Sequence, residues 1–86
     1  MMDILIISPF SYALKQKADD IKLRLFCKEE TNYKLHTIQA LPDDVTDKLH
    51  GKSFDFAYID VNYVDEEVAE IRQHITGEQH KKIKFF

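Results

Sequence analysis

The chain lacks the features that would assign it to several specialised classes of protein. Its 86 residues contain one cysteine, Cys27, so an internal disulfide is excluded and a reducing cytoplasm is the expected compartment. No apolar run approaches the ~20 residues that span a bilayer. The short run Ile4–Ile7 follows Asp3 instead of the basic segment of a signal peptide. We therefore expect one cytoplasmic domain, residues 1–86, without a membrane segment.

An excess of positive charge is also missing. Twelve Lys and Arg residues against fifteen Asp and Glu residues give a formal net charge of −3. This balance disfavours nucleic acid as a partner, because non-specific binding depends on Lys and Arg that neutralise phosphates. The basic segment His80–Lys82 with Lys84 could contact RNA or DNA. The favoured interpretation is a solvated approach to a strand, where basic side chains also blunt an open sheet edge.

Residue clusters that hold metals or perform nucleophilic catalysis are scarce as well. None of the four histidines has the spacing of a zinc ligand set: His36, His50, His74 and His80. Cys27 is accompanied by no His or Asn signature, so we interpret it as a buried thiol at a helix end. The sequence therefore predicts no metal, no cofactor and no enzymatic activity.

Four segments have the apolar patterns of strands. Residues 3–8 contain the consecutive apolar residues Ile4–Ile7, as in parallel strands that are covered on both faces. Residues 33–39 alternate between apolar and polar, which predicts a half-exposed strand near a sheet edge. The apolar run 54–60 ends in an acid, and residues 82–86 form a short last strand.

Three segments between these strands have the patterns of helices. In residues 11–27, one apolar face recurs at spacings of four, three and four, through Leu14, Ala18, Ile21 and Leu25. A short second helix begins near Pro42, and a third begins at Asp65 with the buried face Val64, Val68, Ile71 and Ile75. The chain has two glycines, and we expect Gly51 and Gly77 to end these two helices.

The order of these elements is βαβαβαβ. Right-handed crossovers then require a parallel sheet with helices on both faces. The sequence therefore predicts a three-layer α/β fold, with a flavodoxin-like four-stranded parallel sheet in the order 2-1-3-4 and three helices.

In that order the loop Ser8–Ser11 faces the loop Asp60–Tyr63 at the carboxyl ends of the strands, where open α/β sheets bind ligands. A phosphate site there would need free backbone amides, usually exposed by glycine. Pro9 removes one amide and Phe10 adds bulk. The residue types therefore favour helix capping by Ser8 and Ser11 over ligand binding.

The segment Phe54–Asn62, together with Val68–Arg72 and Lys82–Phe86, resembles the middle of a response-regulator receiver domain. It is most similar to the variety found in peptide-pheromone regulators of Gram-positive bacteria. The resemblance implies that Asp60 matches the acid that accepts a phosphoryl group. That family also binds Mg²⁺ through an acidic pair after the first strand, where this chain has Ser8-Pro9. The hydroxyl residue after the fourth strand and the lysine after the fifth have no counterpart. A phosphoryl-accepting carrier or receiver using Asp60 is therefore the alternative function.

The four-stranded parallel core also resembles the IIB domains of sugar phosphotransferase systems. In that family a cysteine ends the first strand and begins a loop that cradles phosphate. Ser8 holds that position here, while Cys27 lies at the far end of the first predicted helix. A serine does not replace the chemistry of a thiolate.

The last predicted strand, residues 82–86, lies at a sheet edge that three helices leave partly uncovered. Exposed apolar patches mark interaction surfaces, and an open edge can pair with another strand. The residues that we expect on this surface are Ile83, Phe85 and Phe86, with Phe10 and Tyr63 at the top of the sheet. The sequence therefore predicts a non-catalytic regulatory or protein-interaction module, which forms a homodimer or binds a protein partner through this edge.

Overall fold

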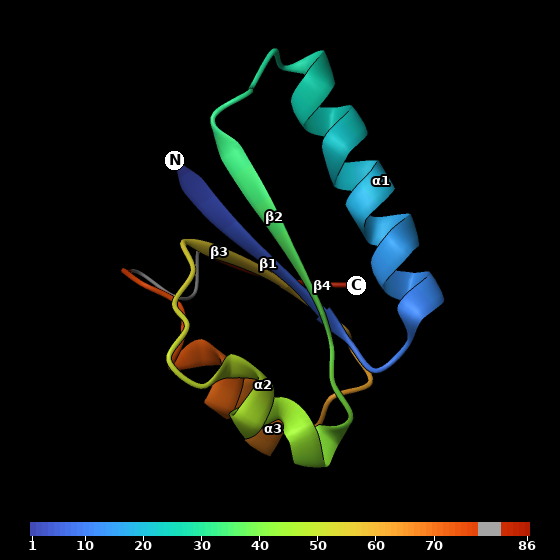
Figure 1. The fold of residues 1–86 in the computed structure, drawn as a ribbon. Coiled ribbons are helices and arrows are strands. Elements are labelled where there is room, and N and C mark those ends of the chain that lie inside the picture. Colours follow the sequence, from blue (N-terminus) through green and yellow to red (C-terminus); the bar gives the residue numbers. More distant parts are fainter. Residues whose placement is uncertain (78–81) are drawn as a thin grey trace.

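The computed structural model describes residues 1–77 and 82–86 and contains a parallel sheet between two helical layers (Figure 1). The strand order is β2-β1-β3-β4, which confirms the predicted flavodoxin-like arrangement. The elements of the described residues are β1 (Met2–Ser8), α1 (Ser11–Cys27), β2 (Tyr33–Gln39), the 3₁₀ turn η1 (Pro42–Asp44), α2 (Val45–Leu49), β3 (Phe56–Ile59), α3 (Asp65–Arg72) and β4 (Ile83–Phe85).

The central strand β1 organises the sheet. It pairs with β2 along its whole length, and its residues Ile4–Ile7 pair with β3. β4 pairs with the outer side of β3. Because successive side chains of a strand point to opposite faces, the apolar run of β1 supplies both layers. Leu5 and Ile7 belong to one core cluster and Ile6 to the other.

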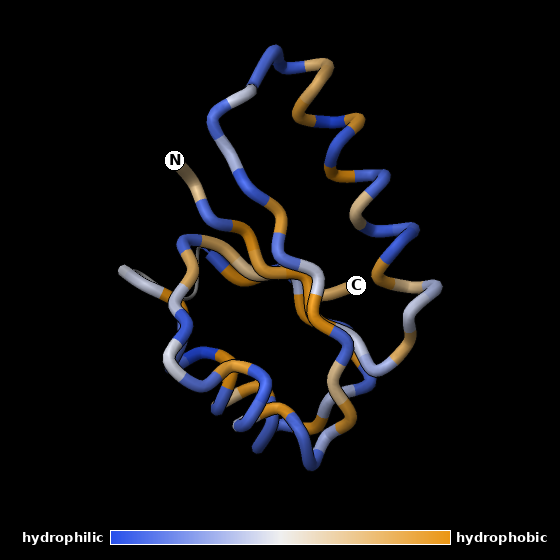
Figure 2. The backbone as a smooth tube through the Cα atoms, in the orientation of Figure 1, coloured by the Kyte–Doolittle hydropathy of each residue, from blue (hydrophilic) through white to orange (hydrophobic). Residues whose placement is uncertain are grey.

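Helices α2 and α3 lie on one side of the sheet and α1 lies on the other (Figure 1). Figure 2 shows hydrophobic residues along the strands and an alternation of hydrophilic and hydrophobic residues along α1. The buried cluster on the α2–α3 face consists of Leu5, Ile7, Ala40, Val45, Leu49, Phe54, Ala57, Ile59, Tyr63, Ile71 and Ile75. The cluster on the α1 face consists of Ile6, Leu14, Ala18 and Ile21.

The third helix is shorter than the apolar spacing predicted. α3 ends at Arg72, and Ile75 is buried outside the helix, in a parallel bridge with Phe54. The Phe54 amide donates to the His74 carbonyl at 2.8 Å, and the Thr76 amide donates to the Phe54 carbonyl at 2.9 Å. The lead-in to β3 therefore gains backbone partners that a longer helix could not supply. Gly77 consequently does not terminate α3, and β3 begins at Phe56 instead of Phe54.

Candidate functional site

Ser8 and Asp60 meet at the carboxyl ends of β1 and β3. The Asp60 amide donates to the Ile7 carbonyl at 3.0 Å, which extends the β1–β3 pairing and brings Asp60 beside Ser8. The Ser8 hydroxyl donates to Asp60 Oδ2 at 2.6 Å. The predicted approach of the two loops is confirmed. Both side chains are buried, with Ser8 at 0% exposure and Asp60 at 4%.

The second carboxylate oxygen of Asp60 is also occupied. Asp60 Oδ1 accepts hydrogen bonds from the backbone amide and the side-chain amide of Asn62, each at 2.8 Å. The carboxylate therefore accepts three hydrogen bonds from its own chain. An Asp that accepts the amide two residues ahead stabilises a tight turn. This geometry makes Asp60 the organising group of the turn after β3, with both carboxylate oxygens hydrogen-bonded inside the protein.

Ser8 joins the ends of two loops. Its hydroxyl oxygen accepts the Phe10 amide at 3.0 Å, and its carbonyl accepts the Ala40 amide at 3.1 Å. The predicted capping role is wrong in its details, because the residue before α1 is Phe10 and no side chain caps that helix. Ser11 is the first helical residue. The Ser8 hydroxyl donates to Asp60 and accepts the Phe10 amide, so it fixes the segment that precedes α1 without capping the helix.

Tyr63 is buried and does not contribute to an exposed surface, so the expectation that it forms part of an interface is wrong. Only 6% of its surface is exposed, and its hydroxyl donates to the Ala40 carbonyl at 2.6 Å. The Tyr63 amide donates to the Asp60 carbonyl, and the resulting turn directs the ring into the α2–α3 face. Burial raises the pKa of Tyr63, and the negative charges of Asp60 and Glu67 raise it further, so the hydroxyl keeps its proton.

The other predicted interface residues differ in exposure. Phe85 is 49% exposed at the sheet edge, and Phe10 is 40% exposed beside Tyr12, with their ring centroids 5.8 Å apart. Ile83 is half-buried against the α2–α3 cluster, and Phe86 is half-buried against the α1 cluster. The predicted surface is therefore concentrated at Phe85, while Ile83 and Phe86 fasten β4 to the core.

Some backbone amide and carbonyl groups of β4 point away from the sheet. The Phe86 amide donates to the Ile59 carbonyl at 3.0 Å, and the Phe86 carbonyl accepts the Val61 amide at 2.8 Å. Both polar groups of Phe86 thus face the sheet. Because neighbouring residues in a strand direct these groups to opposite sides, the amide and carbonyl of Phe85 face the outer edge.

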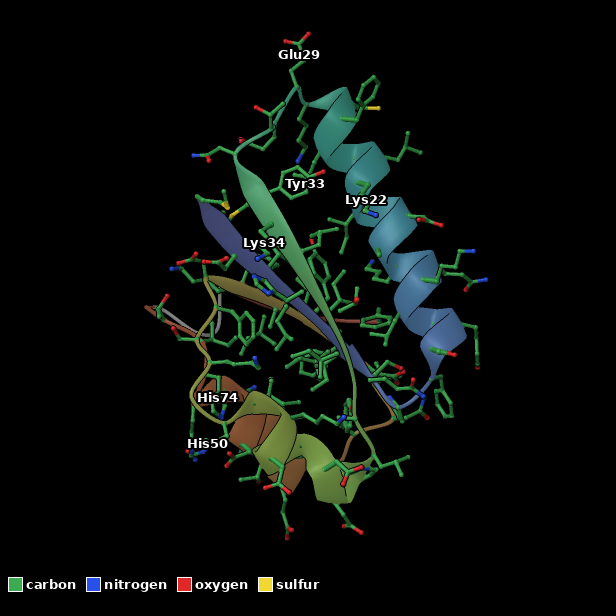
Figure 3. The ribbon with its side chains drawn as sticks, viewed as in Figure 1. Lys22, Glu29, Tyr33, Lys34, His50 and His74 are labelled. Carbon is green, nitrogen blue, oxygen red and sulfur yellow. The ribbon has the colours of Figure 1, made fainter. Side chains whose placement is uncertain are left out.

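The remaining candidates lie apart from Asp60. Within residues 1–77 and 82–86, no group of three or more His, Cys, Asp or Glu residues could hold a metal ion. His36 Nε2 lies 3.0 Å from Asp3 Oδ1, and His74 Nδ1 lies 2.9 Å from the Lys52 carbonyl oxygen. Figure 3 shows His50 and His74 on the α2–α3 side of the sheet. His80 lies outside the described residues.

Cys27 is exposed at the end of α1, so the expectation of a buried thiol is wrong. The helix face that enters the core passes through Ile21 and Leu25, and Cys27 lies off that face. No helix in the described part of the chain has both the length and the apolar character that crossing a bilayer requires.

Sequence reasoning missed Asn62 as a partner of Asp60. The signal was present, because an Asp followed two residues later by Asn is typical of a side-chain-stabilised turn. Comparison with protein-family models, with curated proteins and with solved structures finds no match to this chain.

Proposed function

We propose that this protein is a non-catalytic regulatory module that binds another polypeptide, in the first instance a second copy of itself, by strand pairing at β4. The observation that carries the proposal is the exposed aromatic side chain of Phe85 on an edge strand whose outward backbone groups can pair. An added strand would satisfy those groups and cover the ring.

The opposite edge of the sheet offers less apolar surface. The exposed residues of β2 are polar, namely Lys34, Thr37 and Gln39. Polar and charged side chains on an edge strand discourage pairing with another chain. β4 also has an exposed lysine, Lys84, but that side chain lines the groove on the α1 face, and Phe85 makes this edge the more apolar of the two.

The geometry around Asp60 supports a regulatory role over a catalytic one. Its carboxylate is buried and holds three internal hydrogen bonds, so it stabilises the turn that follows β3. Under this proposal the likeness of β3 and its turn to receiver domains reflects a shared framework whose acid has become structural. We assign the module to the cytoplasm, where the exposed thiol of Cys27 stays reduced.

The substitution Phe85→Asp tests the proposal. We expect the wild-type protein to have twice the 10.1 kDa mass of one chain, and Phe85→Asp to have the mass of one chain. The reason is that pairing would bring two added carboxylates to the same apolar contact. Light scattering after size exclusion measures the mass, and circular dichroism checks that the variant is folded.

Tyr12→Asp is the matched control, because Tyr12 is an exposed aromatic residue on α1 and belongs to no part of the β4 edge. It should leave the mass unchanged. A folded Phe85→Asp variant with the wild-type mass and unchanged capture of any partner would show that the edge is not the interface.

A further inference from the structure

The α1 face of the sheet is only half covered by the described helices. α1 packs on β1 and β2 (Figure 1). On the other half, Phe56 and Tyr58 of β3 point to the same side as α1, since the intervening Ala57 belongs to the opposite cluster. Both rings are half-buried. Parallel sheets are normally covered on both faces, so this half has room for a further layer.

A groove lies between α1 and this half of the sheet, with a volume of 300 Å³. Ile21 and Leu25 line it from α1, and Phe56 and Tyr58 line it from β3. The two aromatic rings are tilted by 42°, with their centroids 5.2 Å apart. The groove therefore offers an apolar and aromatic surface of the kind that is enriched at the centres of interfaces.

Cationic side chains border this groove. Arg24 lines it from α1, Lys28 lines it from the position just after α1, and Lys84 lines it from β4. Within the described residues, no ion pair involves Lys28 or Lys84. The rim is therefore positive on a chain whose formal net charge is −3.

Asp20, an acidic residue near this rim, is already paired. Asp20 lies 3.3 Å from Lys17 Nζ and 3.3 Å from Arg24 Nε. It offsets part of the charge of those two residues and leaves Lys28 and Lys84 for a partner. Burial raises the pKa of Tyr58, with Arg24 lowering it and Asp20 raising it, so the Tyr58 hydroxyl is protonated at neutral pH and can donate to a carboxylate.

We propose that this groove binds an acidic amphipathic helix of a partner protein. The apolar stripe of that helix would pack on Phe56, Ile21 and Leu25, with Tyr58 at the border of the contact, and its Asp or Glu residues would pair with Lys28 and Lys84. An α-helix is about 10 Å wide with its side chains, which suits a single added layer beside α1. This site goes beyond the pairing proposed for the β4 edge and does not depend on it.

Single-stranded nucleic acid is the competing ligand, because aromatic rings flanked by cations also stack with bases. Stacking requires an accessible ring face. Lys17 Nζ lies 5.0 Å from the centroid of Tyr58 and 5.8 Å from that of Phe86, so it occupies space over both rings. The tilt between Phe56 and Tyr58 also departs from a flat platform. These contacts favour the helix.

The test uses three labelled probes: an amphipathic helical peptide with a leucine stripe flanked by Glu, the same peptide with every Glu replaced by Lys, and a single-stranded oligouridylate. Fluorescence anisotropy measures binding to the intact chain at low and high salt. We expect the acidic peptide to bind, with an affinity that falls as salt screens the charges. The basic peptide should bind at least tenfold more weakly. Amide shifts in NMR spectra should cluster at the groove.

Charge reversal at the rim gives the matched comparison. The double variant Lys28→Glu and Lys84→Glu should weaken binding of the acidic peptide roughly tenfold, because two rim pairs become repulsive. The control Lys22→Glu and Lys34→Glu makes the same change in charge at exposed positions on α1 and β2 (Figure 3), and should change the affinity less than about twofold. Phe85→Asp should also leave it unchanged, which separates this site from the β4 edge.

Three results would overturn the inference. The acidic peptide could bind no better than the basic one, or its amide shifts could map outside the groove. The oligouridylate could bind more tightly than the acidic peptide and lose that binding in the Lys28 and Lys84 variant, in which case the groove would be a nucleic-acid surface.

Discussion

The two faces of the sheet differ in how completely they are closed. On the α2–α3 face, four side chains have no exposed surface, those of Leu5, Ile7, Ile59 and Ile71. The buried Tyr63 hydroxyl on this face donates a hydrogen bond to the Ala40 carbonyl. On the α1 face, the buried residues lie beside half-buried aromatic rings and an open groove. The contrast indicates that the α2–α3 face supplies most of the stability, while the α1 face retains apolar surface that a partner could bury.

The largest expected effect compares one buried isoleucine from each face. Ile71→Ala should lower the free energy of unfolding by about 4 kcal/mol, because it leaves a cavity in an enclosed layer. Ile21→Ala should cost only about 2 kcal/mol, because Ile21 borders the groove and the space can be filled by water or by side-chain movement. Urea unfolding followed by circular dichroism measures both. Equal costs would contradict the difference between the two faces.

The second effect concerns the carboxylate between the strand ends. Asp60→Ala should cost about 3 kcal/mol, because it leaves the donors of Ser8 and Asn62 without their shared acceptor. Asp60→Asn should cost less, since the amide oxygen can still accept. Urea unfolding of the two variants gives these values.

A chemical test at Asp60 distinguishes a structural role of its carboxylate from a role as phosphoryl acceptor. Incubation with acetyl phosphate and Mg²⁺, followed by measurement of the intact mass, should give no adduct, because Asp60 is buried and both its oxygens are bonded. A labile adduct on the wild type that is absent from Asp60→Asn would instead support the phosphoryl-carrier function.

The smallest effect compares the same chemical change on the two faces. Tyr63→Phe should cost about 1 kcal/mol, because the buried Ala40 carbonyl loses its donor. Tyr58→Phe should cost less than about 0.5 kcal/mol, because within the described residues the Tyr58 hydroxyl forms no hydrogen bond. Thermal and urea unfolding at neutral pH measure both variants.

The raised pKa of Tyr63 also predicts how the stability of the protein depends on pH. The folded state raises the pKa of Tyr63 above its ordinary value of 10.0, so the stability linked to its bound proton is complete below about pH 10. That contribution is lost as the pH rises from there towards the folded pKa. The stability difference between wild type and Tyr63→Phe should therefore shrink above pH 10. A difference that stays constant to pH 11 would show that Tyr63 titrates normally.

Local patterns predicted the framework of this fold. The run Ile4–Ile7 marked a strand covered on both faces, and the spacing of Leu14, Ala18 and Ile21 marked the buried face of α1. The same reasoning placed Ile75 in a helix, although the structure uses it in a bridge to Phe54. A short apolar spacing fits either state, and the choice depended on a backbone partner more than twenty positions away.

The candidate site was predicted only in part. The approach of Ser8 to Asp60 followed from strand order, because parallel strands bring their carboxyl ends to one edge. Strand order did not predict that the Tyr63 ring is buried, or that Asn62 donates two hydrogen bonds to Asp60. Both features depend on the conformation of the turn after β3. An aromatic residue in a polar loop gives no local sign of which way its ring points.

Periodicity along the chain was therefore enough to determine the alternation of strands and helices, because burial repeats with the geometry of each element. The parallel order of the sheet then followed from the right-handed crossover rule and the flavodoxin-like arrangement. The tertiary structure decided which groups remain available. It buried Asp60 against Ser8 at the strand ends, closed Tyr63 inside the α2–α3 side, left Phe85 at the edge, and left Phe56 and Tyr58 beside an open groove. These outcomes depend on contacts between residues far apart in the chain, whose free energies no local pattern contains.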